Sequence, residues 1–300
     1  MVSAENHDKS TNTSGATLSD PTVNLIDRKV CISIAKSSLQ HIEEGNYEAD
    51  GVVYDIKGAV SATNNSTRYY PPDSELSQWA LVEGGQVQLN QRAGISSSNE
   101  RIGVLNFASA KSPGGGFLGG SRAQEESIAR SSTLYPSLKT TTAEPFYALH
   151  KAHSKHGLYS HAMVYSPGVL FMRADTGDWL PPLIVDVVTA PAVNAGSYRN
   201  HLRKQNIHED TEIDTTMRER MARVLYLFEL QGVRNVVLGS FGTGAFKNRI
   251  ELVAGVWKEL LMSEGARFQS SFDRVVFAVV DSPTYQQFES IFVAPAPHSD

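Results

Sequence analysis

A buried strand that runs straight into a cluster of glycines limits the folds available to this chain. Ile102–Phe107 is a near-continuous apolar run, which is typical of a central strand covered on both faces. Three consecutive glycines follow within Pro113–Gly116, then the pair Gly119-Gly120, and a helix is predicted to open at Gln124. Because glycines carry no side chain, backbone N–H groups can converge there, and such a concavity at a helix N-terminus binds anions.

The same succession of strand, glycine-rich loop and helix occurs again later in the chain. Arg234–Leu238 is predicted to be a strand, Gly239–Gly244 the loop, and Asn248–Glu264 a helix that stops at Gly265. The loop resembles a P-loop, but Ala245 stands where a P-loop needs its lysine. This argues against an ATPase and favours a loop that holds a diphosphate through backbone N–H groups alone.

Two phenylalanines of the second loop leave two interpretations open. Phe241 and Phe246 pack on a ribose or base of a ligand, or they are core side chains on either side of a flexible turn. Parallel strands present their carboxyl ends at one edge of an open α/β sheet, where ligands bind. We therefore expect a diphosphate between the two loops, with Glu125 and Glu126 over the distal sugar.

Strands and helices alternate through the second half of the chain. We expect a strand at Leu183–Val188, a helix at Asp210–Leu230, a strand at Arg274–Val280 and a helix at Thr284–Phe292. This alternation predicts an α/β fold with a mostly parallel sheet covered on both faces. Nearer the N-terminus we expect a helix, a strand and a loop, in that order, at Asp27–Glu44, Gly51–Ile56 and Tyr69–Asp73.

Composition bounds the class of protein. Residues 1–21 are rich in Ser, Thr, Asn and Asp, which predicts a disordered tail. We expect residues 22–300 to form a single domain, with an N-terminal helical extension over 22–95 and a core over 96–300. One cysteine in 300 residues excludes a disulfide scaffold and a Cys-rich zinc site. A net charge of −5 without basic clusters argues against duplex nucleic-acid binding, and we find no signal peptide or membrane span.

Two adjacent acids stand beside a loop suited to anions, where a carboxylate would repel phosphate. Glu125 and Glu126 fit this place if they face a sugar. A carboxyl that is partly desolvated beside a like charge has a raised pKa and can donate a proton at neutral pH, as cleavage of a glycosidic bond requires. The alternative is that the helix dipole alone favours acids in this first turn.

The first glycine cluster also matches the dinucleotide-binding fingerprint in form. Gly114, Gly116 and Gly119 have the required spacing, but five residues separate them from the strand. No acid follows at a strand end about 20 residues on, where that fingerprint places one. The context therefore argues against a Rossmann fold.

The spacing of Gly114-Gly115-Gly116 and Gln124-Glu125-Glu126 resembles the signature of poly(ADP-ribose) glycohydrolases. The surrounding LNFASAKSPGGGF and AQEESIARSSTLY are similar to the microbial-type branch of that family, and the similarity extends from about Ile34 through GSFGTGAFKN to the last strand and helix. The resemblance implies a macrodomain fold, a three-layer α/β/α sandwich with a mixed, mostly parallel sheet. It also implies hydrolysis of the ribose–ribose O-glycosidic bonds of poly(ADP-ribose), releasing ADP-ribose without a metal or other cofactor.

The resemblance further implies roles for individual residues. Glu126 would protonate the departing ribose oxygen and then activate water, and Glu125 would hold the ribose hydroxyls. Phe246 would order the distal ribose, and Asn106 would lie near the catalytic loop. Thr243 stands where we expect the family often to carry cysteine, a change that a backbone donor tolerates. The remaining substrate-binding residues implied are Gly114, Gly115, Gly116, Gln124, Gly239, Ser240, Phe241, Gly242, Thr243, Gly244 and Ala245. The adenine-stacking residue stays unassigned.

Four histidines and the single cysteine invite other chemistry. His150, His153, His156 and His161 lie close together in sequence, but their spacing does not place them on one helix face and no carboxylate is interleaved. We expect surface histidines and no metal site. Cys31 lies in an apolar stretch, which predicts a buried thiol and not a nucleophile.

Two further segments leave their roles open. Ala190–Asn194 follows a predicted strand at its carboxyl end and either borders the site or is an ordinary connection. Tyr69 and Tyr70 stand beside two prolines and either border a cleft or pack within a loop.

The leading hypothesis from the sequence is thus a poly(ADP-ribose) glycohydrolase. A non-catalytic reader of ADP-ribose, or an enzyme that removes single ADP-ribose units from proteins, would share the fold. The paired acids argue against the first alternative and the complete motif against the second. The expected partners are poly(ADP-ribose), ADP-ribose and ADP-ribosylated proteins. We expect a monomer in the cytoplasm or nucleus, with a role in the DNA damage response and no membrane association.

Overall fold

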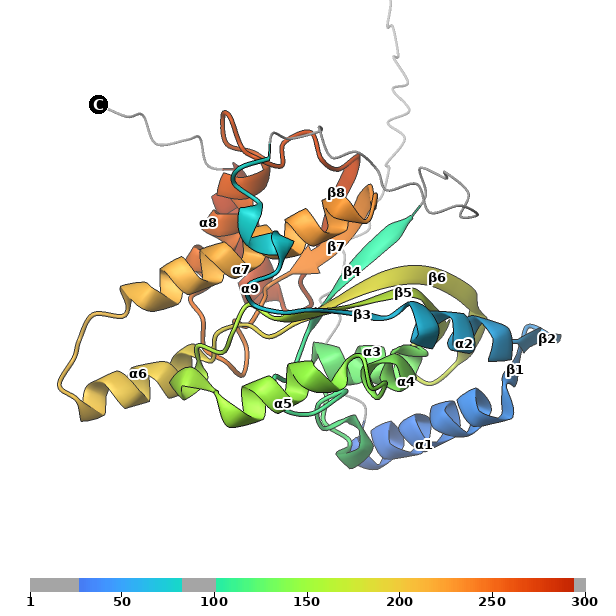
Figure 1. The fold of residues 1–300 in the computed structure, drawn as a ribbon. Coiled ribbons are helices and arrows are strands. Elements are labelled where there is room, and N and C mark those ends of the chain that lie inside the picture. Colours follow the sequence, from blue (N-terminus) through green and yellow to red (C-terminus); the bar gives the residue numbers. More distant parts are fainter. Residues whose placement is uncertain (1–26, 83–100, 294–300) are drawn as a thin grey trace, which may run out of the picture.

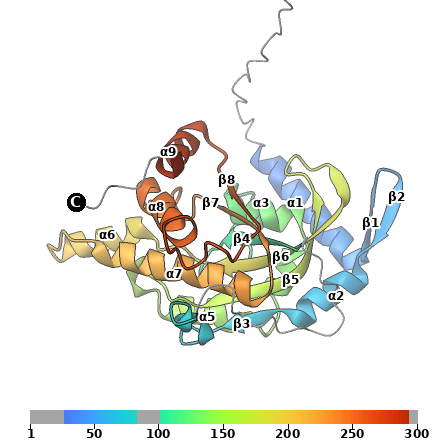
Figure 2. The same cartoon turned by 90° about the horizontal axis from the view of Figure 1, so that it is seen from above.

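The computed structural model describes residues 27–82 and 101–293, so the predicted tail at 1–21 lies outside the described residues. The described chain forms a six-stranded sheet of order β3-β5-β6-β4-β7-β8, with helices on both faces (Figures 1 and 2). The strands of this sheet are β3 (Arg68–Tyr70), β4 (Ile102–Phe107), β5 (Met163–Arg173), β6 (Trp179–Ala190), β7 (Asn235–Gly239) and β8 (Arg274–Ala278).

Strand directions make the sheet mixed. β6, β4, β7 and β8 are parallel, whereas β5 runs antiparallel to both β3 and β6. Val104 of β4 pairs with Val187 on one side and with Val237 on the other. The expectation of a mixed, mostly parallel sheet is therefore confirmed, and β4 lies inside it with parallel partners on both sides.

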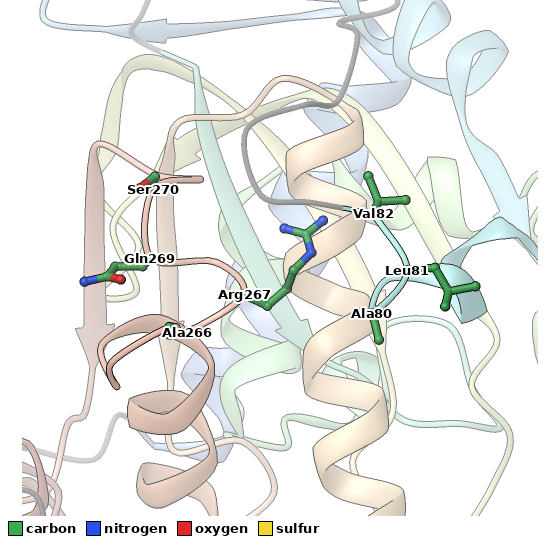
Figure 3. A pocket seen from close by; sticks show the side chains of 8 residues that line it. Ala80, Leu81, Val82, Ala266, Arg267, Gln269 and Ser270 are labelled. Carbon is green, nitrogen blue, oxygen red and sulfur yellow. The ribbon is translucent and has the colours of Figure 1, made fainter.

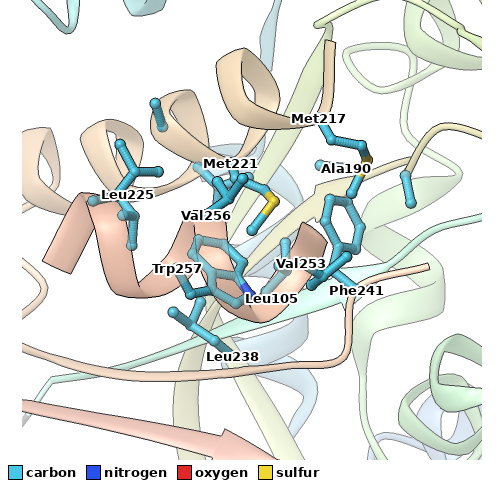
Figure 4. Close-up of a cluster of buried hydrophobic side chains, with 14 of the residues drawn as sticks. Leu105, Ala190, Met217, Met221, Leu225, Leu238, Phe241, Val253, Val256 and Trp257 are labelled. Atoms are coloured by element: carbon cyan, nitrogen blue, oxygen red, sulfur yellow. The ribbon is translucent and has the colours of Figure 1, made fainter. Parts of the chain in front are cut away.

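Side chains that alternate along the strands build a core on each face. Leu105 faces the core beneath α7 (Thr211–Leu230) and α8 (Ile250–Leu261), part of which Figure 4 shows around Trp257. Val104 packs against the other core, beneath three helices: α3 (Gln124–Ser131), α4 (Leu134–Leu138) and α5 (Glu144–Ala152). Two helix layers on one sheet make the three-layer α/β/α sandwich of the macrodomain type.

The remaining helices cover the ends and edges of this sandwich. α6 (Ala195–Lys204) follows β6, and α9 (Ser282–Val293) packs on α8. α1 (Arg28–Glu44) and α2 (Lys57–Ser66) flank the antiparallel hairpin of β1 (Asn46–Ala49) and β2 (Val52–Asp55).

The helix α1 is attached directly to the first glycine-rich loop. Arg28 Nε donates to the Gly119 carbonyl at 2.8 Å. Ala35 of α1 shares a small buried cluster with Phe117 and Ala129, on the loop and on α3. Cys31 is buried, as its apolar surroundings predict.

The predicted strands and helices are found close to their expected positions, with three differences. Tyr69 and Tyr70 belong to edge strand β3, so the predicted loop begins only at Pro71. The strand predicted at Gly51–Ile56 is β2, outside the main sheet. Strand β5 was not expected, because Pro167-Gly168 reads as a turn. Its pairing with β6 shifts register between Ser166 and Val169, and this irregularity accommodates the two residues.

Gly103 is predicted to be required for packing of the central strand. A Cβ at this position would lie 2.5 Å from Phe228 Cε1 and 2.8 Å from Val233 Cγ1, both in the core. We expect Gly103→Ala to lower the free energy of unfolding by about 1–3 kcal/mol. Thermal unfolding measures this as a fall in Tm of about 2–4 °C per kcal/mol.

Gly255→Ala is the matched control, since no atom lies within 4 Å of its Cβ position inside α8. This change should raise the free energy of unfolding by about 0.5–1 kcal/mol. Equal Tm values for Gly103→Ala and the unmodified chain would contradict the packing argument.

Candidate active site

The side chain of Gln124 joins the start of α3 to the end of β4. Its Oε1 accepts from the Phe107 N–H at 2.8 Å, and its Nε2 donates to the Leu105 carbonyl at 2.7 Å. Both polar ends of the amide are thus used by the strand backbone. This side chain fixes the start of the helix that carries the two glutamates, and a contact of Gln124 with substrate stays a prediction.

Glu125 is the more deeply buried of the two acids, at 2% exposure. Its Oε2 accepts from the Ser109 N–H at 2.5 Å, and Asn106 Nδ2 donates to its Oε1 at 3.4 Å. Burial, with the adjacent Glu126, raises the pKa of Glu125 to about 8 against the lowering effect of these hydrogen bonds. At neutral pH the pair therefore carries a proton.

Glu126 lies closer to solvent, at 9% exposure, and its Oε1 accepts from the Gly116 N–H at 2.8 Å. The backbone of Gly115 passes directly over both carboxyl groups. A Cβ on Gly115 would lie 2.3 Å from Glu126 Oε1 and 3.0 Å from Glu125 Oε2, and the residue has φ +58°. Only glycine allows the backbone to approach the pair this closely.

The three glycines of the first loop use their N–H groups within the protein. Gly114 donates to Glu125, Gly115 to the Ser112 carbonyl at 3.0 Å, and Gly116 to Glu126. The sequence predicted a loop that binds anions. In the structure the anions that it holds are the chain's own carboxylates, so these three N–H groups are not open to a diphosphate.

In the structure the second glycine-rich loop spans residues 240–249, and several of its backbone N–H groups donate to no acceptor in the described residues. In residues 27–82 and 101–293 we find no acceptor for the N–H groups of Gly242, Gly244, Ala245 and Phe246. Asn248 fixes the loop, since its Nδ2 donates to Gly242 O at 3.0 Å and to a neighbouring carbonyl. This second loop, and not the first, has the free backbone donors that an anion needs.

The side chains of the second loop point in different directions. Phe241 is fully buried, 5.4 Å between ring centroids from Phe107, in the core shown in Figure 4. Its N–H donates to the Gly239 carbonyl at 2.8 Å, and Trp257 Nε1 donates to the same oxygen. Its burial favours the core interpretation of Phe241, and a contact of Phe241 with substrate stays a prediction. Thr243 Oγ1 turns back to the Ser240 carbonyl at 3.0 Å.

Phe246 is half-buried and has an aromatic neighbour that the sequence did not suggest. The Tyr159 ring lies 6.3 Å from the Phe246 ring, on the segment after α5. Tyr159 has φ +57°, and its hydroxyl hydrogen-bonds the Asn194 side chain. The structure thus holds Tyr159 in a left-handed conformation next to the second loop.

Residues 191–194, after β6, form the floor of the second loop. Val193 O accepts from Asn248 Nδ2 at 2.7 Å. Gly242 has φ +76°, and a Cβ there would lie 2.3 Å from Ala192 Cβ. The segment that follows β6 thus supports the site from within.

Two buried polar groups lie against Glu125. Asn106 Nδ2 also donates to Thr189 Oγ1 at 3.2 Å, and its Oδ1 has no partner among the described residues. Tyr147, on α5, is buried with a hydroxyl that has no such partner either, and burial together with the charge of Glu125 raises its pKa. Asn106 was predicted near the catalytic loop, whereas no sequence pattern indicated Tyr147.

The four histidines of residues 150–161 do not converge. His150 is fully buried and hydrogen-bonds Ser160 Oγ at 2.8 Å, so the expectation that it lies on the surface is wrong. His156 stacks on His201, 3.5 Å between ring centroids. Across the parts of the chain that the structure describes, no three His, Cys, Asp or Glu side chains are grouped to hold a metal ion.

Two hollows among the described residues lie elsewhere. One, of about 440 Å³, lies between residues 80–82 and 265–270 and includes Arg267 (Figure 3). Since residues 265–270 lead into β8, this hollow lies at the amino end of the strands, opposite the two loops. The other, of about 500 Å³, lies beside Arg68 and Tyr69 on edge strand β3. Neither contains a residue of the two glycine-rich loops.

Comparisons with known proteins find one family. A model of the microbial-type PARG catalytic domain matches residues 35–174. The crystal structure of poly(ADP-ribose) glycohydrolase from Thermomonospora curvata is 33% identical over 88% of this chain and 98% of its own, with a TM-score of 0.75. The same enzyme bound to the inhibitor ADP-HPD has 34% identity, the same coverage and a TM-score of 0.74.

A second bacterial enzyme is similar to the same extent in sequence. Poly(ADP-ribose) glycohydrolase from Deinococcus radiodurans in complex with ADP-ribose is 34% identical over 82% of this chain and 99% of its own, with a TM-score of 0.67. No curated protein sequence matches the chain significantly.

Because the pKa of Glu125 is raised, replacing this residue should affect the stability of the folded chain differently at low and at high pH. Between its ordinary pKa of 4.5 and about 8, the folded chain retains a proton that the unfolded chain releases, so this group makes unfolding easier as pH rises. The amide of Glu125→Gln has only one oxygen to accept from Ser109 and Asn106, a loss that is the same at both pH values. The change in Tm on Glu125→Gln should therefore be more favourable at pH 8 than at pH 5, by at least about 2–4 °C.

Thermal unfolding at the two pH values measures this difference. Glu264→Gln, which changes an exposed carboxylate, should leave the difference between pH 5 and pH 8 unchanged. A Glu125→Gln chain that loses stability equally at both values would contradict the assignment.

Proposed function

Because the chain belongs to the microbial-type poly(ADP-ribose) glycohydrolase family, we propose that Glu126 is its catalytic acid and base. The chain is a glycoside hydrolase that acts on poly(ADP-ribose) and binds ADP-ribose. The observation that carries the assignment within the site is the glutamate pair beneath the Gly115 backbone, with Glu126 on the solvent side.

The first chemical step needs a proton at the leaving oxygen. Breaking a ribose–ribose bond would otherwise expel an alkoxide, and a positioned carboxylic acid removes this barrier. Glu126 is the acid nearer to solvent, and its position makes it the one that delivers this proton to the leaving oxygen. Glu125, held by Ser109 and Asn106, binds the ribose hydroxyls and keeps its neighbour in place.

The second step needs a base. After it gives up its proton, Glu126 is a carboxylate that accepts one from water as the water attacks the oxocarbenium-like ribose. The Gly116 N–H stabilises this anionic form through its hydrogen bond to Oε1. The same group thus serves as acid and then as base, and no step requires a metal ion.

The diphosphate of the substrate binds the second loop. Its free N–H groups at Gly242, Gly244, Ala245 and Phe246 supply neutral donors at the edge where Glu126 lies. Gly239 is the last residue of β7 and Ser240, which is partly exposed, is the first residue of the loop. These two residues therefore set where the loop leaves the sheet. Phe246, with Tyr159 beside it, orders the distal ribose over the acids.

The broader biology belongs to the same proposal. ADP-ribosylated proteins are the expected carriers of the polymer, and an intracellular monomer that acts in the DNA damage response is the expected setting. In residues 27–82 and 101–293 no helix is both long and apolar enough to cross a bilayer.

Residues 22–300 are proposed as a single domain, because β3, from the N-terminal part, lies in the same sheet as β4–β8.

Glu126→Gln tests the catalytic assignment. The amide oxygen still accepts from the Gly116 N–H, so the loop is expected to stay in place. Release of ADP-ribose from purified polymer should fall by about 10²–10⁴-fold, the usual contribution of a general acid–base group. ADP-ribose binding, measured by calorimetry, should change by less than about threefold, since the ligand itself keeps its other contacts.

Three outcomes would contradict the proposal in different ways. Full activity in Glu126→Gln would remove Glu126 from the reaction. An unmodified chain that binds ADP-ribose but releases none from polymer would be a reader. Activity that is lost in EDTA and restored by added metal would overturn the metal-free mechanism.

A further inference from the structure

Arg220 of α7 is a fully buried cation with unusual partners. Its Nη1 donates to the Pro191 carbonyl at 3.0 Å and its Nη2 to the Leu158 carbonyl at 2.8 Å, while its Nε has no partner among the described residues. Neither acceptor carries a charge. In that part of the chain no Asp or Glu forms an ion pair with Arg220.

The surroundings of Arg220 confirm that its charge is not neutralised. Burial, with Arg223 nearby, lowers the pKa of Arg220 to about 9, so the group remains a cation at neutral pH. Burial and then the Arg220 charge lower the pKa of His150 to about 4 and of His161 to about 3, which keeps both rings neutral. An unpaired buried charge is costly to a fold, and this one has no evident structural partner.

Both carbonyls that Arg220 binds belong to segments beneath the second loop. Leu158 precedes Tyr159, whose ring lies 6.3 Å from that of Phe246. Pro191 precedes Ala192, which contacts Gly242. The cation therefore lies one layer behind the loop whose free N–H groups face the ligand.

We propose that Arg220 is a positioning residue for diphosphate binding: it fixes the segments at Leu158 and Pro191 under the second loop, and its unpaired charge is neutralised by the ligand's diphosphate. This inference rests on the proposed function. The chain has a net charge of −5 and the second loop offers only neutral donors, so another group must attract the doubly charged diphosphate. The Arg220 cation can do so, because a buried charge acts through a low dielectric and is little screened by salt.

The test compares two ligands on three variants. Arg220→Met removes the charge and keeps the volume, and Arg220→Lys keeps the charge. Arg223→Met is the matched control, one turn further along α7, because Arg223 is also buried but is paired with Glu219 at 2.7 Å. Calorimetry measures the dissociation constants of ADP-ribose and of adenosine, which lacks the diphosphate.

Arg220→Met should weaken ADP-ribose binding by about tenfold or more and adenosine binding by less than about threefold, because only ADP-ribose carries the negative charge that Arg220 attracts. Arg220→Lys should bind ADP-ribose nearly as tightly as the unmodified chain does. Arg223→Met should leave the ratio of the ADP-ribose and adenosine dissociation constants unchanged. Equal losses for both ligands, or no loss for either, would overturn the inference. An unmodified chain that does not bind ADP-ribose would instead contradict the proposed function.

A measurement on the unmodified chain decides the matter if Arg220→Met does not fold. The Arg220 Nε–H is shielded from water, so in protein labelled with ¹⁵N-arginine it should give a slowly exchanging NMR signal. Saturating ADP-ribose should shift this signal and adenosine should not. Identical spectra with the two ligands would overturn the inference.

Discussion

Backbone N–H groups donating to two adjacent buried carboxyls are the interaction on which this site depends. The Ser109 and Gly116 donors offset part of the cost of burying Glu125 and Glu126 beside each other, where the carboxyls lose water and repel one another. The loop can donate from so close only because Gly115 has no side chain. Gln124 then ties the helix that carries both acids to the end of β4. The strand, the helix and the loop thus together hold a pair of carboxyl groups that retains a proton at neutral pH.

The sequence was most informative about fold where local pattern and tertiary role agree. Ile102–Phe107 is apolar except for Asn106 because both of its faces are covered, and the structure has a strand with those bounds. Strand β5 escaped prediction because Pro167 and Gly168 break the local pattern, while pairing with β6 accommodates them through a shift in register. That the sheet is mixed could not be read from the residues alone, and was expected only from the resemblance to the family.

The candidate site shows the same division between local and distant information. The glycine spacing and the adjacent acids are local, and both indicated this edge of the sheet. Which anion each loop can bind depends on which of its N–H groups already donate to acceptors within the protein. These hydrogen bonds form only in the folded chain, so the sequence did not reveal them. Phe241 and Phe246 are five positions apart in one loop, yet Phe241 is fully buried in the core, whereas Phe246 is only partly buried against it and lies beside Tyr159. Tyr159 and Arg220 reach the site from distant segments, so no spacing rule could have found them.

The strand order has a consequence for how the enzyme is made. β4 and the two glutamates come early in the chain, but β4 lies between β6 and β7, which are synthesised much later. Thr189, which holds Asn106 against Glu125, is at the end of β6, and the diphosphate loop follows β7. A ribosome-bound chain that ends before β7 therefore has its acids, but β4 lacks its partner on one side and the loop for the ligand is missing. Because long-range parallel pairing forms late, hydrolytic competence arrives in a single step, with completion of the sheet.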